Sequence, residues 1–263
     1  MDENKLFLKI IEDKFQRFRD YYAMDSSDFL SLEQQSMAAG FMRTARKEGA
    51  FLYGGYSDAE RRMVVFMPDY TGVTSEEEAE EWFAQNPDEC PLAVLDIKVP
   101  AADWGRLTHR DYLGALMGEG IRREKVGDII VSEDGAQIVV AREMAEYLQQ
   151  NYRQVGRVSF TAKIVPISGL NTGEIRIETE KFTVSSPRLD NIISGAFNVS
   201  RKDAVEAISR GKVFVGGTEM SKPDYNLKGG EKVVLRGKGK IIYKGECGTS
   251  RKGKTYIEII KYI

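Results

Sequence analysis

The sequence predicts an α+β protein made of an N-terminal α/β region, a ferredoxin-like middle domain and a small basic C-terminal domain. Three observations lead to this prediction. Two segments of helical apolar spacing are followed by two strand-like segments over residues 1–73, and a β-α-β-β-α-β order follows over residues 74–166. Two short capped helices followed by small strands occupy residues 187–263, after a strand-bearing connector at residues 167–186.

The N-terminal region begins with a predicted amphipathic helix over residues 3–22, whose apolar and aromatic residues fall at helical spacing. A partner-binding groove is one interpretation of this aromatic stripe, but core packing fits it better. A second helix over residues 31–47 and two strands, at 51–56 and 63–67, complete the region. The polar turn between the strands predicts a hairpin.

An acidic helix opens the middle domain. Thr74 supplies a capping hydroxyl before a run of glutamates, and carboxylates in the first turn stabilise a helix. Metal binding by these carboxylates is the alternative, and a solvated helix face fits them better. The elements that follow are a strand at 92–99, a helix that begins at Thr108 with a capping box, strands at 128–131 and 137–140, a helix at 142–152 and a strand at 158–165.

This order also underlies RNA-recognition modules, which stack bases on aromatic residues of their two central strands. The corresponding strands here, 92–99 and 137–140, carry no aromatic residue, so RNA binding by this domain requires another surface. The candidates for that surface are His109, Arg110, Arg122, Arg123 and Lys125. A merely solvated turn explains residues 122–125 equally well.

The C-terminal domain carries the main candidate site. Ser186 is predicted to cap a first helix that starts at Pro187, and Ser200 caps a second. Free N–H groups at helix starts favour phosphate oxygens, and cationic side chains stand near both starts. These cations are Arg188, Arg201, Lys202 and Arg210.

Charge is distributed unevenly along the chain, although the formal net charge is only −2. Residues 187–263 contain 16 Lys and Arg against 8 Asp and Glu, whereas the remainder contains 22 against 32. A basic end on an acidic body predicts that this end meets a polyanion.

The other sequence features exclude several classes of protein. Cys90 and Cys247 are too few for a disulfide framework or a four-cysteine zinc site. The N-terminus predicts neither a signal peptide nor a transmembrane span. A cytoplasmic protein that binds no membrane, metal or cofactor is expected.

The C-terminal domain resembles the ribosomal-protein-S-four-type RNA-binding domain, hereafter the S-four-type domain. The resemblance rests on three stretches: Ser185-Ser186-Pro187-Arg188-Leu189-Asp190-Asn191-Ile192-Ile193, Ser200-Arg201-Lys202-Asp203-Ala204-Val205 and Gly211-Lys212-Val213-Phe214-Val215. It implies a helix-turn-helix with small strands that binds RNA. The same domain occurs in pseudouridine synthases and tyrosyl-tRNA synthetases.

The middle region is similar to that of bacterial YlmH-type proteins. The similar stretches are Leu107-Thr108-His109-Arg110-Asp111-Tyr112-Leu113-Gly114-Ala115-Leu116-Met117-Gly118, its continuation over residues 120–129, and Phe51-Leu52-Tyr53-Gly54-Gly55-Tyr56. The resemblance implies a non-enzymatic factor linked to cell-division genes and to ribosome-associated quality control. Such factors bind a stalled large subunit that carries peptidyl-tRNA and assist tailing of the nascent chain.

The sequence and the resemblance together predict a non-catalytic protein that binds rRNA and tRNA on the large ribosomal subunit, alongside quality-control factors. Asp190 either orients a neighbouring arginine or accepts from a ribose hydroxyl. The expected RNA-binding residues are Arg188, Asp190, Ser200, Arg201, Lys202, Arg210, Lys212, Lys222, Arg236, Lys238 and Lys240.

Two alternatives remain open. The first is an RNA-modifying enzyme, of pseudouridine synthase or methyltransferase type, that depends on an acid such as Asp96 or Asp111. The lone histidine, His109, has no nucleophile pattern beside it, and we assign it a capping or RNA-contact role. The second alternative is a cell-division-linked interaction protein with an acidic N-terminal partner surface.

Overall fold

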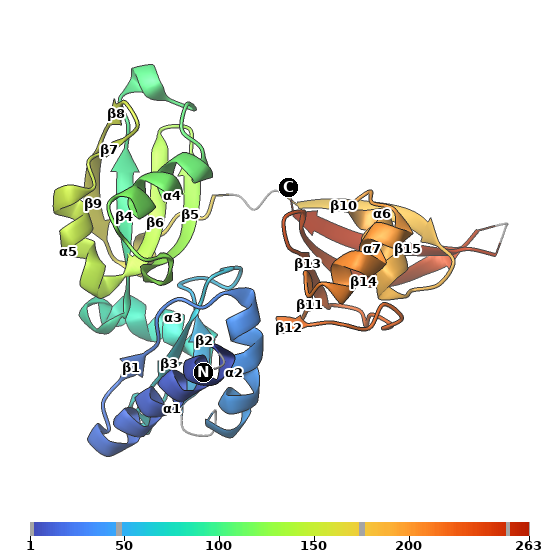
Figure 1. Cartoon of the computed structure of the whole chain (residues 1–263), viewed down its shortest axis with the longest axis horizontal. Coiled ribbons are helices and arrows are strands. Elements are labelled where there is room, and N and C mark those ends of the chain that lie inside the picture. The colour runs from blue at the N-terminus through green and yellow to red at the C-terminus, as the bar shows by residue number, and fades with distance from the viewer. Residues whose placement is uncertain (1–2, 46–48, 174–176, 251–252, 263) are drawn as a thin grey trace. The chain divides into compact units, whose positions relative to one another are not determined.

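The computed structural model describes residues 3–45, 49–173, 177–250 and 253–262. The chain divides into two compact units, residues 1–172 and 173–263, and each combines helices with antiparallel sheets (Figure 1). In this described part of the chain, no helix is both long enough and apolar enough to cross a membrane.

Two helices and a small sheet form the first part of unit 1. These elements are α1 (Glu3–Tyr21), β1 (Asp25–Ser26), α2 (Leu32–Ala45), β2 (Ala50–Tyr53) and β3 (Met63–Phe66), with sheet order β1-β3-β2. The rings of Phe15 and Phe18 on α1 lie 5.6 and 5.9 Å from the ring of Phe66. The aromatic stripe of α1 therefore packs into the core, as the spacing predicts.

Helix α3 (Glu76–Gln85) begins one residue later than the predicted cap implies. The hydroxyl of Ser75 accepts from the backbone N–H of Glu78 at 3.2 Å. Thr74 donates its N–H and its hydroxyl to the Glu78 carboxylate, and these hydrogen bonds lower the pKa of Glu78. The acidic first turn is thus a capping arrangement.

A four-stranded sheet with two helices forms the rest of unit 1, in the predicted β-α-β-β-α-β order. The elements are β4 (Leu92–Lys98), α4 (His109–Gly118), β5 (Val126–Ser132), β6 (Gly135–Ala141), α5 (Arg142–Asn151) and β9 (Thr161–Val165), with a short pair β7 (Gln154–Val155) and β8 (Val158–Ser159) before β9. The strand order is β5-β6-β4-β9, and all neighbours are antiparallel. Leu95 and Ile138 pack with both helices in one core.

The opposite face of this sheet packs in a second core. Val94 and Val139 are fully buried there, together with Phe83 of α3 and Tyr53 of β2. The helix-free sheet face is the one on which an RNA-recognition module stacks bases. At these positions, the N-terminal strands and α3 occupy that face instead.

A carboxylate on β5 connects the two parts of unit 1. Asp128 accepts a hydrogen bond from the Tyr56 hydroxyl at 2.8 Å. It also accepts from the backbone N–H of Arg61 at 3.1 Å and from that of the preceding residue at 2.7 Å. The Arg61 guanidinium in turn donates to the carbonyl oxygens of Val126 and Phe29, both at 3.0 Å. Burial lowers the pKa of Arg61 to about 10, so the side chain stays charged near neutral pH.

Unit 2 is a six-stranded antiparallel sheet with two short helices. Its elements are β10 (Ile177–Val184), α6 (Leu189–Ala196), α7 (Arg201–Ser209), β11 (Val213–Val215), β12 (Thr218–Glu219), β13 (Lys232–Leu235), β14 (Gly239–Thr249) and β15 (Thr255–Tyr262). The strand order is β10-β15-β14-β13-β11-β12. Strand β10 comes from the predicted connector and pairs with β15 along its full length, from Ile177–Tyr262 to Val184–Thr255. The core includes Ile192 and Ile208 from the helices.

Candidate nucleic-acid interface

The first helix of unit 2 begins later than the sequence predicts. Helix α6 starts at Leu189 after an extended Arg188, whereas a start at Pro187 with a Ser186 cap was expected. The carbonyl and hydroxyl oxygens of Ser186 instead accept from the side-chain amide of Asn191, both at 3.1 Å. This amide fixes the incoming chain against the first turn of α6.

The backbone N–H groups at this helix start are already used. Those of Leu189 and Asp190 donate to the carbonyl oxygens of Tyr225 and Pro223, at 2.8 and 3.0 Å. The expectation that both helix starts offer free N–H groups to phosphate is therefore wrong for these residues of α6. Attraction of an anion to this end of α6 has to come from side chains.

A buried carboxylate holds two arginines at the same place. Asp190 is 1% exposed. Arg188 donates from Nε to Oδ1 at 3.1 Å and from Nη2 to Oδ2 at 3.2 Å, and Arg201 of α7 donates from Nε to Oδ2 at 3.0 Å. We call these three residues the arginine clamp. Two guanidinium groups share one carboxylate, so the clamp keeps one positive charge in excess.

The clamp presents its charge to solvent in a fixed geometry. The side chains of Arg188 and Arg201 are 36% and 56% exposed, although the carboxylate between them is buried. A held guanidinium plane can form two parallel hydrogen bonds with a phosphate, and less side-chain entropy is lost when it does so. Asp190 therefore orients neighbouring arginines, which is the first of the two roles expected from the sequence.

Further polar groups lie around the clamp. Ser200 caps α7 as predicted, because its hydroxyl accepts from the Asp203 N–H at 3.1 Å. Lys202 is exposed in the first turn of that helix, and Lys222 is exposed beside Pro223, which accepts from the start of α6. We define the phosphate surface as Arg188, Ser200, Arg201, Lys202 and Lys222.

The other predicted RNA-binding residues lie elsewhere in unit 2. Arg210 follows the last turn of α7 and pairs with Glu206 at 2.7 Å. The Lys212 carbonyl accepts from the Arg236 N–H at 2.9 Å, which places these residues side by side. Lys238 lies exposed in the turn between β13 and β14, and Lys240 is half-buried at the start of β14. The eleven predicted residues therefore do not form a single patch around the helix starts.

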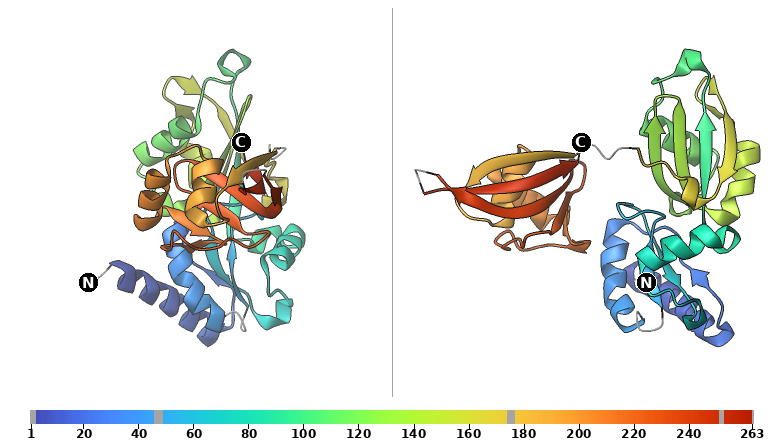
Figure 2. Two further views of the ribbon diagram at one scale, coloured as in Figure 1. Left: turned by 90° about the vertical axis from the view of Figure 1, so that its right-hand side faces the viewer. Right: turned by 180° about the vertical axis from the view of Figure 1, so that it is seen from behind.

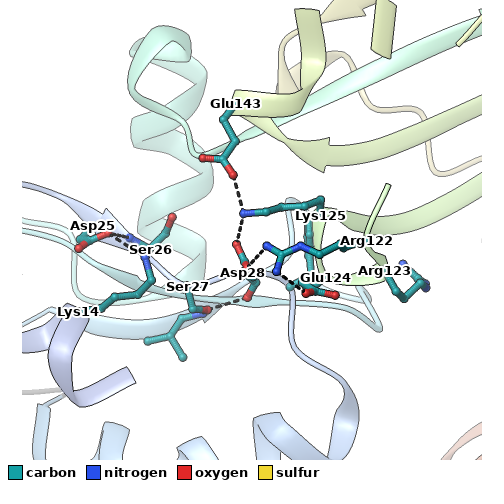
Figure 3. Close-up of polar contacts among 12 residues, drawn as sticks. Lys14, Asp25, Ser26, Ser27, Asp28, Arg122, Arg123, Glu124, Lys125 and Glu143 are labelled. Atoms are coloured by element: carbon teal, nitrogen blue, oxygen red, sulfur yellow. Dashed lines mark hydrogen bonds and ion pairs between the residues drawn. The ribbon is translucent and has the colours of Figure 1, made fainter. Parts of the chain in front are cut away.

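The candidate residues of the middle domain divide into two groups. His109 and Arg110 are exposed in the first turn of α4. Lys125 instead bridges Asp28 at 2.6 Å and Glu143 at 2.5 Å, and these contacts raise its pKa although partial burial opposes the charge (Figure 3).

The two arginines of this loop also make contacts within unit 1. Arg122 lies 3.8 Å from Asp28 and 3.3 Å from Glu124, and Arg123 donates to the carbonyl oxygens of Val126 and Gly127. Residues 122–125 therefore connect the β1 region with the middle sheet and are more than a solvated turn. RNA contact by Arg122, whose side chain is 65% exposed, stays a prediction. The sequence contains no signal for the contact between Lys125 and Asp28, because the two residues are 97 positions apart.

The acids named for the enzyme alternative have structural partners. Asp111 accepts from the N–H and the hydroxyl of Thr108, and these hydrogen bonds lower its pKa. Asp96 accepts from the side-chain amide of Gln137 at 3.1 Å. Neither arrangement places a general base beside a nucleophile.

The helix pair that carries the arginine clamp lies within an S-four-type RNA-binding domain. The family model "S4 domain" matches residues 187–233, and the model "Putative RNA-binding domain in YlmH" matches residues 86–168. The chain is 30% identical over 237 residues to "Ribosome-associated protein quality control protein P2" of Bacillus subtilis, covering 90% of this chain and 86% of the relative. The chain therefore belongs to the YlmH-type family.

Three further matches each cover a smaller share of this chain. A protein of Aquifex aeolicus, named "Uncharacterized RNA pseudouridine synthase", is 34% identical over 86 residues, which is 29% of this chain and 36% of that protein. "Small ribosomal subunit protein uS4" of Rhodopirellula baltica is 28% identical over 122 residues, which is 45% of this chain and 56% of that protein. The solved structure "Cell division protein ylmH from Streptococcus pneumoniae" is 22% identical with a TM-score of 0.45, covering 64% of this chain and 94% of that chain.

Proposed function

We propose that this chain is a non-catalytic RNA-binding protein of ribosome-associated quality control. It binds rRNA and tRNA on the large ribosomal subunit and assists tailing of nascent chains on stalled subunits in the cytoplasm. The observation that carries the proposal is the arginine clamp, in which buried Asp190 directs two partly exposed guanidinium groups outward beside Lys202. The printed name of the Bacillus subtilis relative supports the connection to quality control.

The phosphate surface is suited to the backbone of RNA. Arginine and lysine side chains supply most backbone contacts in nucleic-acid interfaces, and these contacts fix the orientation of the protein without reading the base sequence. A sequence-independent grip fits an rRNA or tRNA target that is recognised by shape. The arginine clamp therefore does not have to recognise individual bases.

Binding to the large subunit is tested by sedimentation of the whole chain with purified subunits, at low and at moderate salt. The wild type is expected to co-migrate with the subunit under both conditions. The double variant Arg201→Gln/Lys202→Gln is expected to dissociate at moderate salt, because it loses two cations. Glutamine can still donate to Asp190, whereas alanine at both arginines would leave that carboxylate buried without its partners.

Lys163→Gln serves as the matched control, because Lys163 is an exposed cation of unit 1. It is expected to sediment as the wild type does. If the wild type stays among free proteins in both gradients, the large subunit is not the target. The search would then turn to free RNA and to protein partners.

A further inference from the structure

The buried carboxylate of the arginine clamp has no capacity left for a ligand. Besides its three hydrogen bonds from Arg188 and Arg201, Asp190 accepts from the backbone N–H of Asn191 at 3.0 Å. An ionised carboxylate has about four lone-pair positions, so these hydrogen bonds occupy them. Asp190 is also only 1% exposed. A ribose hydroxyl at this place would therefore need another partner.

The loop between β12 and β13 lies against the start of α6. In the right-hand view of Figure 2, α6 and α7 are the two orange helices behind the strands of unit 2. Backbone N–H groups at the start of α6 donate to the carbonyl oxygens of Tyr225 and Pro223 at 2.8 and 3.0 Å. Within the loop, Glu231 accepts from the Tyr225 hydroxyl and from the Lys228 N–H, both at 2.7 Å. These contacts fix the loop beside the arginine clamp.

Asn226 is the residue of this loop that lies directly opposite Arg188. The two residues form an antiparallel β-bridge, and the hydrogen bond from Leu189 to Tyr225 flanks it. They are therefore a non-hydrogen-bonded pair, in which the side chains lie on the same face and the Cα atoms are about 4.5 Å apart. Leu227, the next residue, is 7% exposed and packs in the core, so Asn226 points away from the core.

The side-chain amide of Asn226 is available to a ligand. The residue is exposed, and its side chain makes no hydrogen bond within the described part of the chain. An amide can both donate and accept, as a ribose 2′-hydroxyl can. It carries no charge, so it contributes a directed hydrogen bond and not a general attraction for the RNA backbone.

We propose that Asn226 hydrogen-bonds the ribose 2′-hydroxyl beside the phosphate that Arg188 binds, which makes the phosphate surface selective for RNA over DNA. In RNA the 2′-hydroxyl stands next to the 3′-phosphate of the same sugar, so a phosphate on Arg188 brings a hydroxyl close to its bridge partner. Phosphates are common to RNA and DNA, whereas the 2′-hydroxyl is not. The inference rests on the proposed RNA-binding function and names the chemical group that is recognised.

The test compares two fluorescent hairpins of one base sequence, one of RNA and one of 2′-fluoro RNA, by anisotropy with the whole chain. The 2′-fluoro sugar keeps the A-form helix, but it cannot donate a hydrogen bond and accepts one only weakly. Asn226→Ala is expected to weaken binding of the RNA hairpin about 2- to 10-fold, as the loss of one hydrogen bond does, and to leave binding of the 2′-fluoro hairpin unchanged. The salt dependence is expected to stay that of the wild type, because no charge is lost.

Gln154→Ala is the matched control, because Gln154 is an exposed amide of unit 1. It is expected to bind both hairpins as the wild type does. Hydrogen exchange of the Leu189 N–H, which donates to Tyr225, verifies that Asn226→Ala keeps the bridge.

The outcomes separate this inference from the proposed function. If Asn226→Ala binds both hairpins as tightly as the wild type while Arg201→Gln binds both more weakly, the ribose contact is wrong and the proposed function stands. If Asn226→Ala weakens binding of both hairpins equally, its amide contacts a base or a phosphate, which also overturns the inference. If the wild type binds neither hairpin, the proposed RNA binding and the inference are both wrong.

Discussion

Replacing Asp190 by alanine is expected to weaken RNA binding although the variant gains a positive charge. Asp190 is 1% exposed and holds Arg188 and Arg201 in place, so its removal frees both side chains to adopt other rotamers. A simple charge argument predicts the opposite sign, because a more positive protein attracts RNA more strongly. The direction of the change in affinity therefore separates an oriented clamp from a merely basic surface.

The same substitution is expected to lower the stability of unit 2 by about 2–3 kcal/mol. Removing one partner of a fully buried ion pair costs about 3–5 kcal/mol, and the cost is smaller here because the two arginines can turn toward water. Hydrogen exchange of α6 and α7 in the whole chain measures the stability, and filter binding of structured RNA measures the affinity.

Asp224→Ala is the matched control for Asp190→Ala. Asp224 is exposed in the loop beside α6, and its replacement adds the same charge. This variant is expected to leave the hydrogen exchange of α6 and α7 unchanged. Its affinity for RNA is expected to equal that of the wild type or to be slightly higher. If Asp190→Ala behaves like this control, Asp190 does not position the arginines.

Replacing Asp128 by alanine is expected to destabilise unit 1 by about 3 kcal/mol or more. The carboxylate accepts from the Tyr56 hydroxyl and from two backbone N–H groups, and hydrogen bonds to a charged group each contribute about 1.5–3 kcal/mol. Its loss also removes one of the two carboxylates, Asp128 and Glu124, whose negative charges favour the charged form of the half-buried Arg61 guanidinium. Thermal unfolding and hydrogen exchange over residues 50–66 and 126–132 measure the effect.

Glu143→Ala is the control in the same unit. Glu143 is 65% exposed at the side chain and pairs with Lys125, which keeps its contact with Asp28. An exposed pair contributes less than about 1 kcal/mol. A loss of stability for Asp128→Ala no larger than that of this control would show that the Asp128 contacts do not connect the two parts of unit 1.

Most secondary structure could be predicted because its signals are local. The Thr108 capping box and the Ser200 cap each join residues three positions apart, so the sequence displays them directly. The strand spanning Lys254 to Tyr262 was expected from its alternation, and β15 occupies Thr255–Tyr262. The predicted start of α6 was wrong by two residues, because pairing with the loop at Tyr225 keeps Arg188 extended.

The contacts that organise the candidate site were harder to predict. Charged residues read from a sequence are assumed to face water, yet Asp190 is buried. One signal could have shown this, since Asp190 stands beside Leu189 and three positions before Ile193, on the apolar side of its helix. No comparable signal exists for Asp128 and Tyr56, because 72 positions separate them and only the folded chain brings them together.

The central claim is that Arg201 contacts phosphate from the surface of unit 2, and the salt dependence of RNA binding tests it most directly. For wild type, Arg201→Gln and the Lys163→Gln control, the logarithm of affinity is measured against the logarithm of salt concentration. Loss of one phosphate contact is expected to make the slope shallower by about 0.7–0.9 for Arg201→Gln alone. An unchanged slope for Arg201→Gln would contradict the claim and remove the clamp from the RNA interface.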